Sequence, residues 1–187
     1  MRRRRLLRGV AAGAGAGTLT LTQEVTAQPS PPYIQWAFDV LFGGRSSPTV
    51  VDGIAYISNY YLYAVDATSG YEQWRFETAY SIYSSPMVAG GTVYVGSGDG
   101  DLYAVDAQTG TRQWRFETGD EIESSPTVAD GTIYVGNDDN NLYAVDAASG
   151  NEQWRFETGG NVRSSPTVAD GTVYVGSWDP NLYAVCV

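Results

Sequence analysis

The side chains that could do chemistry in this sequence are mainly carboxylates, because the chain contains no histidine and all of its cationic residues are arginine. The absence of histidine removes the commonest general base and most zinc sites. The absence of lysine removes Ser-x-x-Lys nucleophiles as well. Acid/base catalysis would therefore depend on Asp and Glu alone.

Two acidic loops are the strongest candidates for a metal site, at residues 99–101 (Asp-Gly-Asp) and 138–140 (Asp-Asp-Asn). A meander of strands would place them at the same end as Asp120, Glu121 and Glu123, and clustered carboxylates can hold Ca²⁺. The D-x-D spacing lacks a distal bidentate Glu, however, and the loop differs in every copy. We therefore expect solvated turn acids, and we assign no catalytic, cofactor-binding or metal-binding residue.

These loops belong to a repeat of about 40 residues that extends from Ser46 to the C-terminus. Its Ser-Ser-Pro anchor recurs with prolines at Pro48, Pro86, Pro126 and Pro166, in steps of 38, 40 and 40 residues. A fixed period of this length indicates an array of identical supersecondary units.

Each copy consists of four short runs rich in Val, Ile, Tyr and Trp, separated by turn residues. The first gap is Asp-Gly or Gly-Gly, as at Asp130-Gly131, which tolerates the positive φ of a tight hairpin. The later gaps are a polar loop and a Ser/Thr-Gly turn. A four-stranded antiparallel meander in each copy predicts an all-β fold, a β-propeller with four blades in this chain. The blades are expected at 46–78, 84–118, 124–158 and 164–187.

The motif A-V-D-x-x-[ST]-G-x-x-Q-W begins at Ala64, Ala104 and Ala144. It resembles the tryptophan-docking motif of the pyrroloquinoline-quinone-like (quinoprotein-type) β-propeller repeats, and the resemblance covers Tyr33 to Val185. It implies that each Trp of an outer strand packs on the Gly turn and the Ala of a neighbouring blade. The implied blade-docking residues are Trp36, Trp74, Trp114, Trp154, Gly70, Gly110, Gly150, Ala64, Ala104, Ala144, Asp66, Asp106 and Asp146.

The family resemblance also implies a possible cofactor. Enzymes of this family bind the quinone at the centre of an eight-bladed ring, beside Ca²⁺, a catalytic Asp and often two adjacent cysteines. This chain has a single cysteine, half the blades and nearly interchangeable copies, whereas a catalytic site needs blade-specific residues. We therefore expect no cofactor, with pyrroloquinoline quinone and Ca²⁺ as the alternative.

The last copy ends after its third strand, and residues 33–39 resemble the missing fourth strand. We expect this N-terminal strand to close the last blade. Three outcomes stay open: a four-bladed ring in one chain, two chains forming an eight-bladed ring with exchanged N-terminal strands, or a gene fragment in which Cys186 replaces the Asp of the other copies. Cys186 cannot form an internal disulfide.

The N-terminus reads as an export signal. An Arg-Arg-x-Leu-Leu sequence that begins at Arg3 precedes a weakly apolar stretch and the small residues 25–27 (Val-Thr-Ala), which resembles a twin-arginine signal peptide cleaved after Ala27. Residues 28–32 would be a linker. The apolar stretch is too short to span a bilayer. The alternative is a start codon set too early before a cytoplasmic protein.

The composition is strongly acidic, with a formal net charge of −10 although five arginines lie in the first eight residues. A domain this acidic and free of lysine resembles exported haloarchaeal proteins, so stability should rise with salt. Nucleic acid is disfavoured as a partner, because no basic patch can neutralise phosphates.

The uniform blades and the missing catalytic residues predict a protein that is not an enzyme, and the N-terminal signal predicts export. The resemblance to the family's assembly-scaffold members implies a scaffold for protein–protein interaction at the cell envelope, either at the cell surface or outside the cell. Its partner would be another envelope or secreted protein, and a homodimer is also possible. Trp178, in the irregular loop 177–180, is the first candidate contact residue. The main alternative is a fragment or half of a pyrroloquinoline-quinone-dependent dehydrogenase-like quinoprotein. A sugar- or polymer-binding module rests only on tyrosines such as Tyr94, Tyr134 and Tyr174.

Overall fold

The computed structural model describes residues 32–41 and 45–187 of the 187-residue chain. The expected signal peptide 1–27, and all of the expected linker except Pro32, lie outside these residues. Chain contacts separate Met1–Ile34 from a compact unit, Gln35–Val187, and the account below concerns this second unit. In the described part of the chain, no helix has the length and apolar character needed to cross a membrane.

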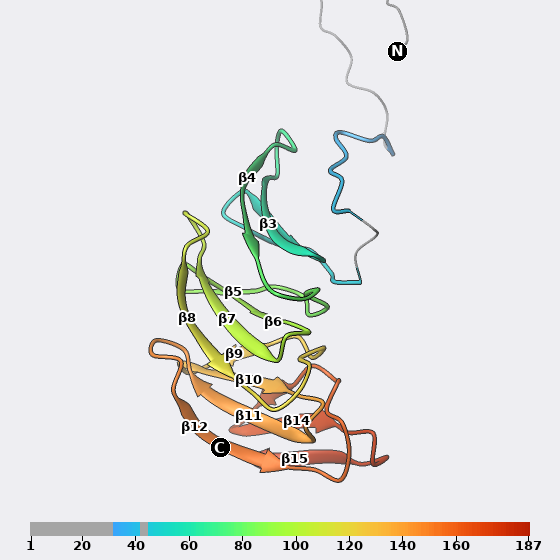
Figure 1. The fold of residues 1–187 in the computed structure, drawn as a ribbon, viewed down its shortest axis with the longest axis vertical. Coiled ribbons are helices and arrows are strands. Elements are labelled where there is room, and N and C mark those ends of the chain that lie inside the picture. Colours follow the sequence, from blue (N-terminus) through green and yellow to red (C-terminus); the bar gives the residue numbers. More distant parts are fainter. Residues whose placement is uncertain (1–31, 42–44) are drawn as a thin grey trace, which may run out of the picture. The chain divides into compact units, whose positions relative to one another are not determined.

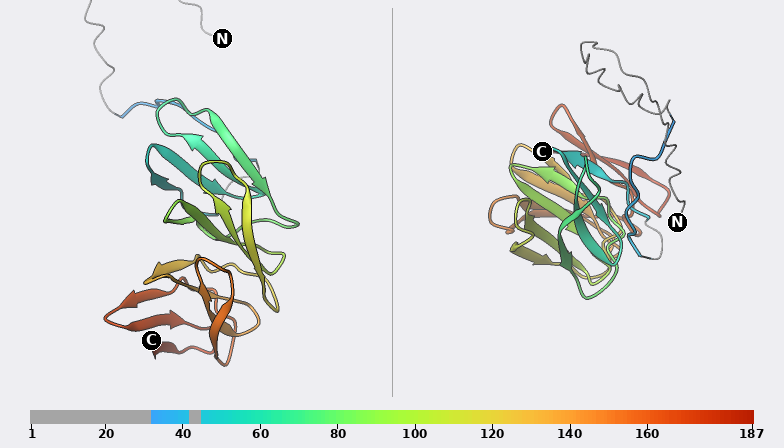
Figure 2. Two further views of the ribbon diagram at one scale, coloured as in Figure 1. Left: turned by 90° about the vertical axis from the view of Figure 1, so that its left-hand side faces the viewer. Right: turned by 90° about the horizontal axis from the view of Figure 1, so that it is seen from above.

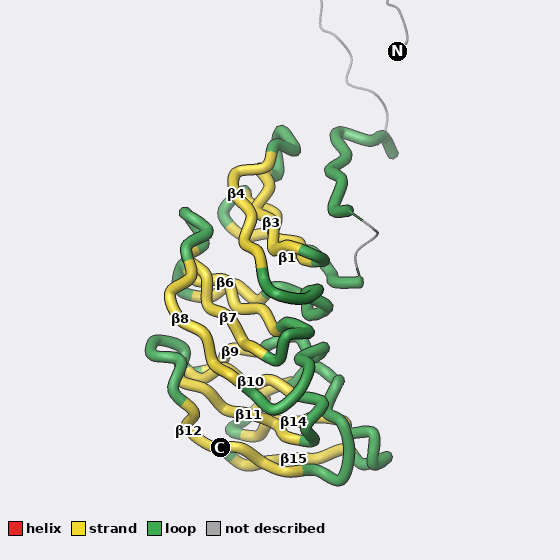
Figure 3. The backbone as a smooth tube through the Cα atoms, in the orientation of Figure 1, coloured by secondary structure: helices red, strands yellow, loops and turns green. Residues whose placement is uncertain are grey.

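The unit consists of four antiparallel sheets that follow one another in sequence order (Figures 1 and 3). The predicted all-β propeller class is confirmed. The first sheet holds β1 (Thr49–Val51), β2 (Ile54–Ser58), β3 (Tyr61–Asp66) and β4 (Glu72–Glu77), and the second β5 (Met87–Ala89), β6 (Thr92–Gly96), β7 (Asp101–Asp106) and β8 (Arg112–Glu117). The third holds β9 (Thr127–Ala129), β10 (Thr132–Gly136), β11 (Asn141–Asp146) and β12 (Glu152–Glu157), and the last β13 (Thr167–Ala169), β14 (Thr172–Gly176) and β15 (Leu182–Cys186).

The turns between the first two strands of each sheet have the backbone that their residues favour. Asp130 and Gly131 have φ values of 48° and 77°, and Gly90 and Gly91 have 57° and 77°. Two consecutive positive φ values define the hairpin turn whose twist matches that of the flanking strands. These turns therefore set the register in which the inner strand of each sheet pairs with the second strand.

The core lies between the sheets and repeats at each interface. At the first interface, Tyr56, Leu62 and Ala64 of the first sheet pack against Val93 and Val105 of the second, together with further buried residues of both sheets. Equivalent side chains form the second and third interfaces. Each of the two middle sheets therefore packs against the preceding sheet on one face and against the following sheet on the other. The sheets lie face to face in sequence order (Figure 2).

The Ser-Ser-Pro anchor connects neighbouring sheets. The Ser84 hydroxyl donates to Gly96 O at 2.8 Å and accepts from Gly96 N at 2.8 Å, which ties the anchor to its own sheet. The next residue, Ser85, accepts a hydrogen bond from Ser47 N of the preceding repeat and donates its own N–H to Ser125 of the following one, both at 2.8 Å. The repeated serines thus form a line of hydrogen bonds from sheet to sheet.

The expected closing strand is not formed. The last sheet has three strands, and the sheets are not closed into a ring by hydrogen bonds. Residues 33–39 adopt no strand. Trp36 and Phe38 lie instead on the first sheet, where Phe38 meets the ring of Tyr63 at a centroid distance of 5.3 Å. The prediction that 33–39 pairs with the last sheet within this unit is therefore wrong, because Trp36 and Phe38 lie on the first sheet and β15 belongs to the last sheet at the other end of the array.

Candidate functional site

Tryptophans of the repeat dock the first sheet onto the second and the second onto the third. The indole N–H of Trp74, on β4, donates to Ala107 O at 3.1 Å, just beyond β7 of the second sheet. The ring lies on the following turn, where a Cβ added to Gly110 would come within 2.8 Å of it. Gly110 also has a φ of 72°. A glycine is needed here both for the backbone and for the ring.

The same docking occurs at two further positions. Trp36 donates to Ala67 O at 3.0 Å and lies on Gly70, and Trp114 donates to Ala147 O at 3.2 Å and lies on Gly150. Trp154 has its ring 5.8 Å from that of Tyr134. In the described part of the chain, we find no corresponding indole hydrogen bond for Trp154.

The alanines of the motif occupy a different place from the one that the family resemblance implied. Ala64 is the direct cross-strand partner of Trp74 within the same sheet, and a β-bulge follows it. Ala104 and Ala144 stand in the same relation to Trp114 and Trp154. The small side chain therefore makes room for the indole inside its own sheet, while the glycine turn comes from the next sheet.

The aspartates of the motif hold the glycine turn in shape. Asp66 accepts hydrogen bonds from the backbone N–H groups of Thr68 and Ser69, and from the Ser69 hydroxyl at 2.7 Å. These bonds, chiefly that from the Ser69 hydroxyl, lower the pKa of Asp66. Asp106 and Asp146 accept equivalent bonds, and their pKa values are lowered in the same way. Each carboxylate holds the turn on which a tryptophan lies: Trp36 for Asp66, Trp74 for Asp106 and Trp114 for Asp146.

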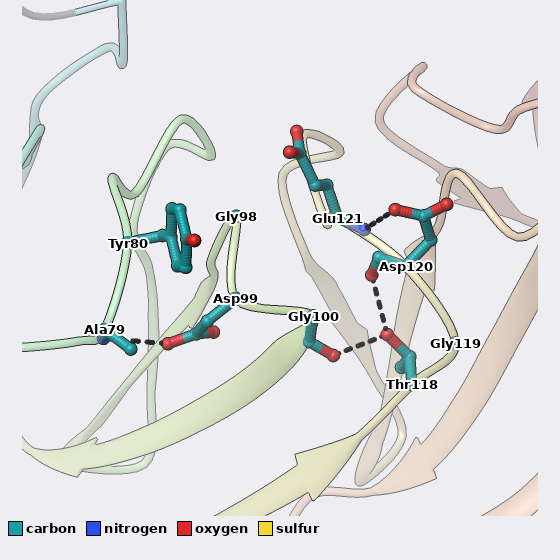
Figure 4. A pocket seen from close by; sticks show the side chains of 9 residues that line it. All are labelled: Ala79, Tyr80, Gly98, Asp99, Gly100, Thr118, Gly119, Asp120 and Glu121. Atoms are coloured by element: carbon teal, nitrogen blue, oxygen red, sulfur yellow. Dashed lines mark hydrogen bonds between the residues drawn. The ribbon is translucent and has the colours of Figure 1, made fainter.

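The other end of the sheets carries longer loops, and we call it the loop face. It comprises the segments that join consecutive sheets (78–83, 118–123 and 158–163) and the loops after each second strand (59–60, 97–100, 137–140 and 177–181). Backbone bonds such as Gly98 N to Ser81 O, at 2.9 Å, hold the two kinds of segment together. A groove of about 570 Å³ lies between them, lined by Tyr80, Asp99, Asp120 and Glu121 among others (Figure 4).

The aspartates at the centre of these loops are structural braces. Asp99 accepts from Ala79 N at 3.0 Å and from the Tyr103 hydroxyl at 2.9 Å (the first bond is drawn in Figure 4). Asp139 accepts equivalent bonds from Gly119 N and Tyr143, and Asp179 from Gly159 N and Tyr183. The hydrogen bonds that Asp179 accepts, chiefly that from Tyr183, lower its pKa to about 2. Burial and the Asp139 carboxylate raise the pKa of Tyr143 to about 12.

The neighbouring acids are also paired within the protein. Asp101 accepts from Arg115 at 3.1 Å and is buried, and burial raises its pKa against the opposing effects of the Tyr103 hydroxyl and Arg115. Asp138 accepts both the Nε and an Nη of Arg163. The expectation that the acids of 99–101 and 138–140 are solvated turn residues is therefore wrong for these carboxylates, although Asp120 and Glu121 are exposed.

Trp178 has the most distinctive surroundings on the loop face. Its side chain is 66% exposed, and its ring lies over the guanidinium of Arg163 at 4.4 Å. Arg163 is held from beneath by Asp138 and by Glu123, whose carboxylate lies 3.2 Å from the guanidinium. Trp178 N donates to Asn161 O at 2.9 Å, so that its backbone is fixed too.

The copies differ in chemistry at this cluster. The positions of Trp178 and Asp138 correspond to Gly98 in the second sheet. Arg163 corresponds to Glu123, Tyr83 and Arg45 in the other repeats. The irregular loop sequence singled out Trp178, but it did not reveal that Arg163 stacks on the ring or that Asp138 and Glu123 hold Arg163 in place.

One protein-family model matches almost all of the described chain. The model described as outer membrane protein assembly factor BamB matches residues 22–124 and 99–186. The chain belongs to this family. The predicted pyrroloquinoline-quinone-like (quinoprotein-type) repeat is confirmed, since solved structures of quinoproteins match as well as BamB. No sequence among the curated proteins matches closely enough to count as a relative.

Two solved structures illustrate the range of this BamB-like fold. BamB from Moraxella catarrhalis is 25% identical, with a TM-score of 0.68 over 76% of this chain and 46% of its own. The quinohemoprotein alcohol dehydrogenase ADHIIG from Pseudomonas putida HK5 is 26% identical, with a TM-score of 0.68 over 74% of this chain and 29% of its own. The chain thus spans less than half the length of either protein.

A third solved structure is matched over nearly its whole length. The computationally designed Ika4 protein is 15% identical, with a TM-score of 0.69 over 83% of this chain and 99% of its own. At this identity the likeness concerns the fold alone.

The loop face offers few free carboxylates that could bind the Ca²⁺ that accompanies the quinone in the family's enzymes. Over residues 32–41 and 45–187, no three Asp, Glu, Cys or His side chains are arranged to hold a metal ion. Asp99, Asp101 and Asp139 direct their oxygens to protein donors. This donor set does not fit a bound Ca²⁺, and we derive no chemistry through one.

Proposed function

We propose that this BamB-family chain is a non-enzymatic, exported scaffold that binds another protein of the cell envelope through its loop face. The observation that carries the proposal is the exposed Trp178 stacked on Arg163. The ring and the guanidinium stacked on it together present an aromatic and a cationic group at one exposed position.

The surroundings of Trp178 suit a binding contact. Tryptophan and arginine are the residues most enriched among binding hot spots. Arg163 makes ion pairs with Asp138 and Glu123, so little side-chain freedom is left to lose when a partner docks on the ring. The exposed carboxylates of Asp120 and Glu121 lie on the same face. A partner segment with apolar and basic side chains would match this chemistry.

The proposed location rests on two independent supports. The matched family is described as an outer membrane protein assembly factor, and the N-terminal residues have the arginine pair and small-residue cleavage pattern of an exported protein. We propose an envelope-associated or extracellular protein, with the twin-arginine pathway as the export route.

The proposal can be tested by crosslinking the protein to its partners in the cell envelope of its own organism, at the salt concentration in which that organism grows. The native chain should capture one protein in near-stoichiometric amount, and Trp178→Ala should reduce that capture at least tenfold. Tyr71→Ala is the matched control, because Tyr71 is a similarly exposed aromatic residue (77%) in the turn before β4, away from the loop face. Capture that is equal for both variants, or no capture at all, would contradict the proposal.

A second candidate function follows from the solved relatives. The similarity to a quinohemoprotein alcohol dehydrogenase at 26% identity supports a part of a dehydrogenase-like quinoprotein. Addition of pyrroloquinoline quinone and Ca²⁺ should then shift the absorbance of the quinone and support dye-linked oxidation of an alcohol or sugar. Neither change at saturating quinone would eliminate this candidate.

A further inference from the structure

The last sheet exposes a face that the other three sheets bury. In each earlier sheet a tyrosine, a leucine and an alanine on the outward face are covered by the next sheet, and their exposures are at most 5% (Tyr56, Leu62, Ala64; Tyr94, Leu102, Ala104; Tyr134, Leu142, Ala144). The same triplet in the last sheet is uncovered. Tyr174 is 40% exposed, Leu182 is 75% exposed, and Ala184 is exposed.

The first sheet has a complementary cavity on the face that does not pack against the second sheet. An apolar cavity of about 290 Å³ is lined by Trp36, Phe38, Val40, Pro48, Ala55, Ile57 and Val65. Counted along the repeat, most of these residues correspond to members of the next interface: Ala55 to Val93, Ile57 to Val95, and Val65 to Val105. In that interface the equivalent space is filled by the Tyr-Leu-Ala triplet of the preceding sheet.

The N-terminal segment already stands where a preceding sheet would place its fourth strand. Trp36 docks on Gly70 as Trp74 docks on Gly110. Phe38 meets Tyr63 at 5.3 Å as Phe76 meets Tyr103 at 5.4 Å. One end of the unit therefore carries a segment in the place of a fourth strand but without its sheet, and the other end carries a sheet without its fourth strand.

We infer that this chain pairs head to tail with a second copy of itself. The Tyr174, Leu182 and Ala184 face of one copy fills the cavity on the first sheet of the other, and residues 33–39 of that other copy pair with β15. The register follows from the first sheet, where Ala64 opposes Trp74 and Leu62 opposes Phe76. Leu182 of one copy then opposes Phe38 of the second.

A second copy is the occupant that the structure favours, because the contact continues an interface the chain already makes three times. Each copy offers both the triplet and the cavity, so two identical contacts close a ring of eight sheets with no free end. Pairing with residues 33–39 also covers the open edge of β15. Within the unit Gln35–Val187 both faces stay exposed, so the unit does not satisfy them itself.

The mass of the full 187-residue chain in molar salt, measured by light scattering, tests this pairing. We expect twice the mass of one chain, and the mass of a single chain for Leu182→Asp at the same concentration. The exposure of Leu182 allows this change without disturbing the fold of one copy. Tyr80→Asp, at a comparably exposed position (68%) on the loop face between the first and second sheets, should remain a dimer. A monomeric native chain, a dimer that Leu182→Asp leaves intact, or an open series of larger oligomers would overturn the proposal.

Disulfide trapping distinguishes pairing between copies from closure within one. Directly opposed residues of antiparallel strands have Cα atoms about 4.5–5.5 Å apart, within the range of a disulfide. In a Cys186→Ser background, a chain with Leu182→Cys is mixed with a chain with Phe38→Cys. Oxidation should give a covalent dimer of the two variants. No covalent dimer, or a doubly substituted chain that forms its disulfide within one copy, would overturn the proposal. Loss of binding through Trp178 would leave either result unchanged.

Discussion

The ring of Trp74 lies so close to Gly110 that a β-carbon on that glycine would come within 2.8 Å of it. The indole N–H is meanwhile bonded to Ala107 O, three residues earlier in the same turn. Two contacts thus fix the indole on one short turn of the next sheet. Because the arrangement recurs at Trp36 and Trp114, its energetics can be tested at one interface.

Gly110→Ala should destabilise the protein by more than a backbone effect alone. Gly131 is the matched control, since its φ of 77° is similar to the 72° of Gly110, but a Cβ there would meet nothing within 4 Å. Gly131→Ala should cost about 1–2 kcal/mol of unfolding free energy from left-handed backbone strain. Gly110→Ala should cost about 1–3 kcal/mol more, from overpacking against the ring. Urea unfolding in molar salt measures both, and equal losses would refute the clash.

Trp114→Ala should remove a large share of the stability of the second interface. The indole packs beside Tyr94 at a centroid distance of 5.8 Å and bonds to Ala147 O. Truncating a packed tryptophan typically costs about 3–5 kcal/mol. Trp178→Ala, which removes an exposed ring, should change stability by less than about 0.5 kcal/mol. Comparable urea midpoints for the two variants would show that the docking contact is not a main source of stability.

Asp179 should make the protein sensitive to acid in a defined range. The hydrogen bonds that it accepts, chiefly that from Tyr183, lower its folded pKa to about 2, below the ordinary value for an aspartate. A carboxylate with a lowered folded pKa contributes stability above its unfolded pKa, and that contribution is lost as the pH falls from about 4 towards 2. Asp179→Asn should therefore lower the melting temperature at pH 7 and flatten its decline between pH 4 and 2.

Glu157→Gln serves as the control for this acid titration, because Glu157 is an exposed acid at the end of β12 outside the brace network. Its melting curve should follow that of the native chain across the same pH range. A decline below pH 4 that is identical in all three proteins would mean that Asp179 makes no such contribution.

Salt should stabilise the protein, because the chain has a net charge of −10 and its acids repel one another. The Debye length falls from about 10 Å at 0.1 M to about 3 Å at 1 M salt, which removes most of that repulsion. The melting temperature should rise over this range in KCl. KCl is preferred to a sulfate salt, because sulfate also stabilises proteins by being excluded from their surface. A melting temperature that is unchanged or lower in molar KCl would contradict the expected adaptation to salt.

The sheets and their turns could be predicted from the sequence because both depend on neighbouring residues. The Asp130-Gly131 pair favours positive φ, and alternating side chains such as those of 132–136 favour a strand with two different faces. The motif resemblance likewise led to Trp74 and Gly110. It placed Ala64 in the wrong sheet, however, because a cross-strand partner and a neighbour from the next sheet cannot be distinguished from spacing alone.

The chain's own sequence thus determined an array of antiparallel sheets, the positions of their tight turns and the tryptophans that dock one sheet on the next. The tertiary structure decided which loop acids become braces, as Asp139 does by accepting from Gly119 N and Tyr143. It also decided that Arg163 lies between Asp138 and Trp178, and that both ends of the array carry unmatched faces. Local patterns are set by bonds to nearby residues. The contacts of Gly119 with Asp139 and of Arg163 with Asp138 and Trp178 instead join separate loops, so only the folded chain brings them together.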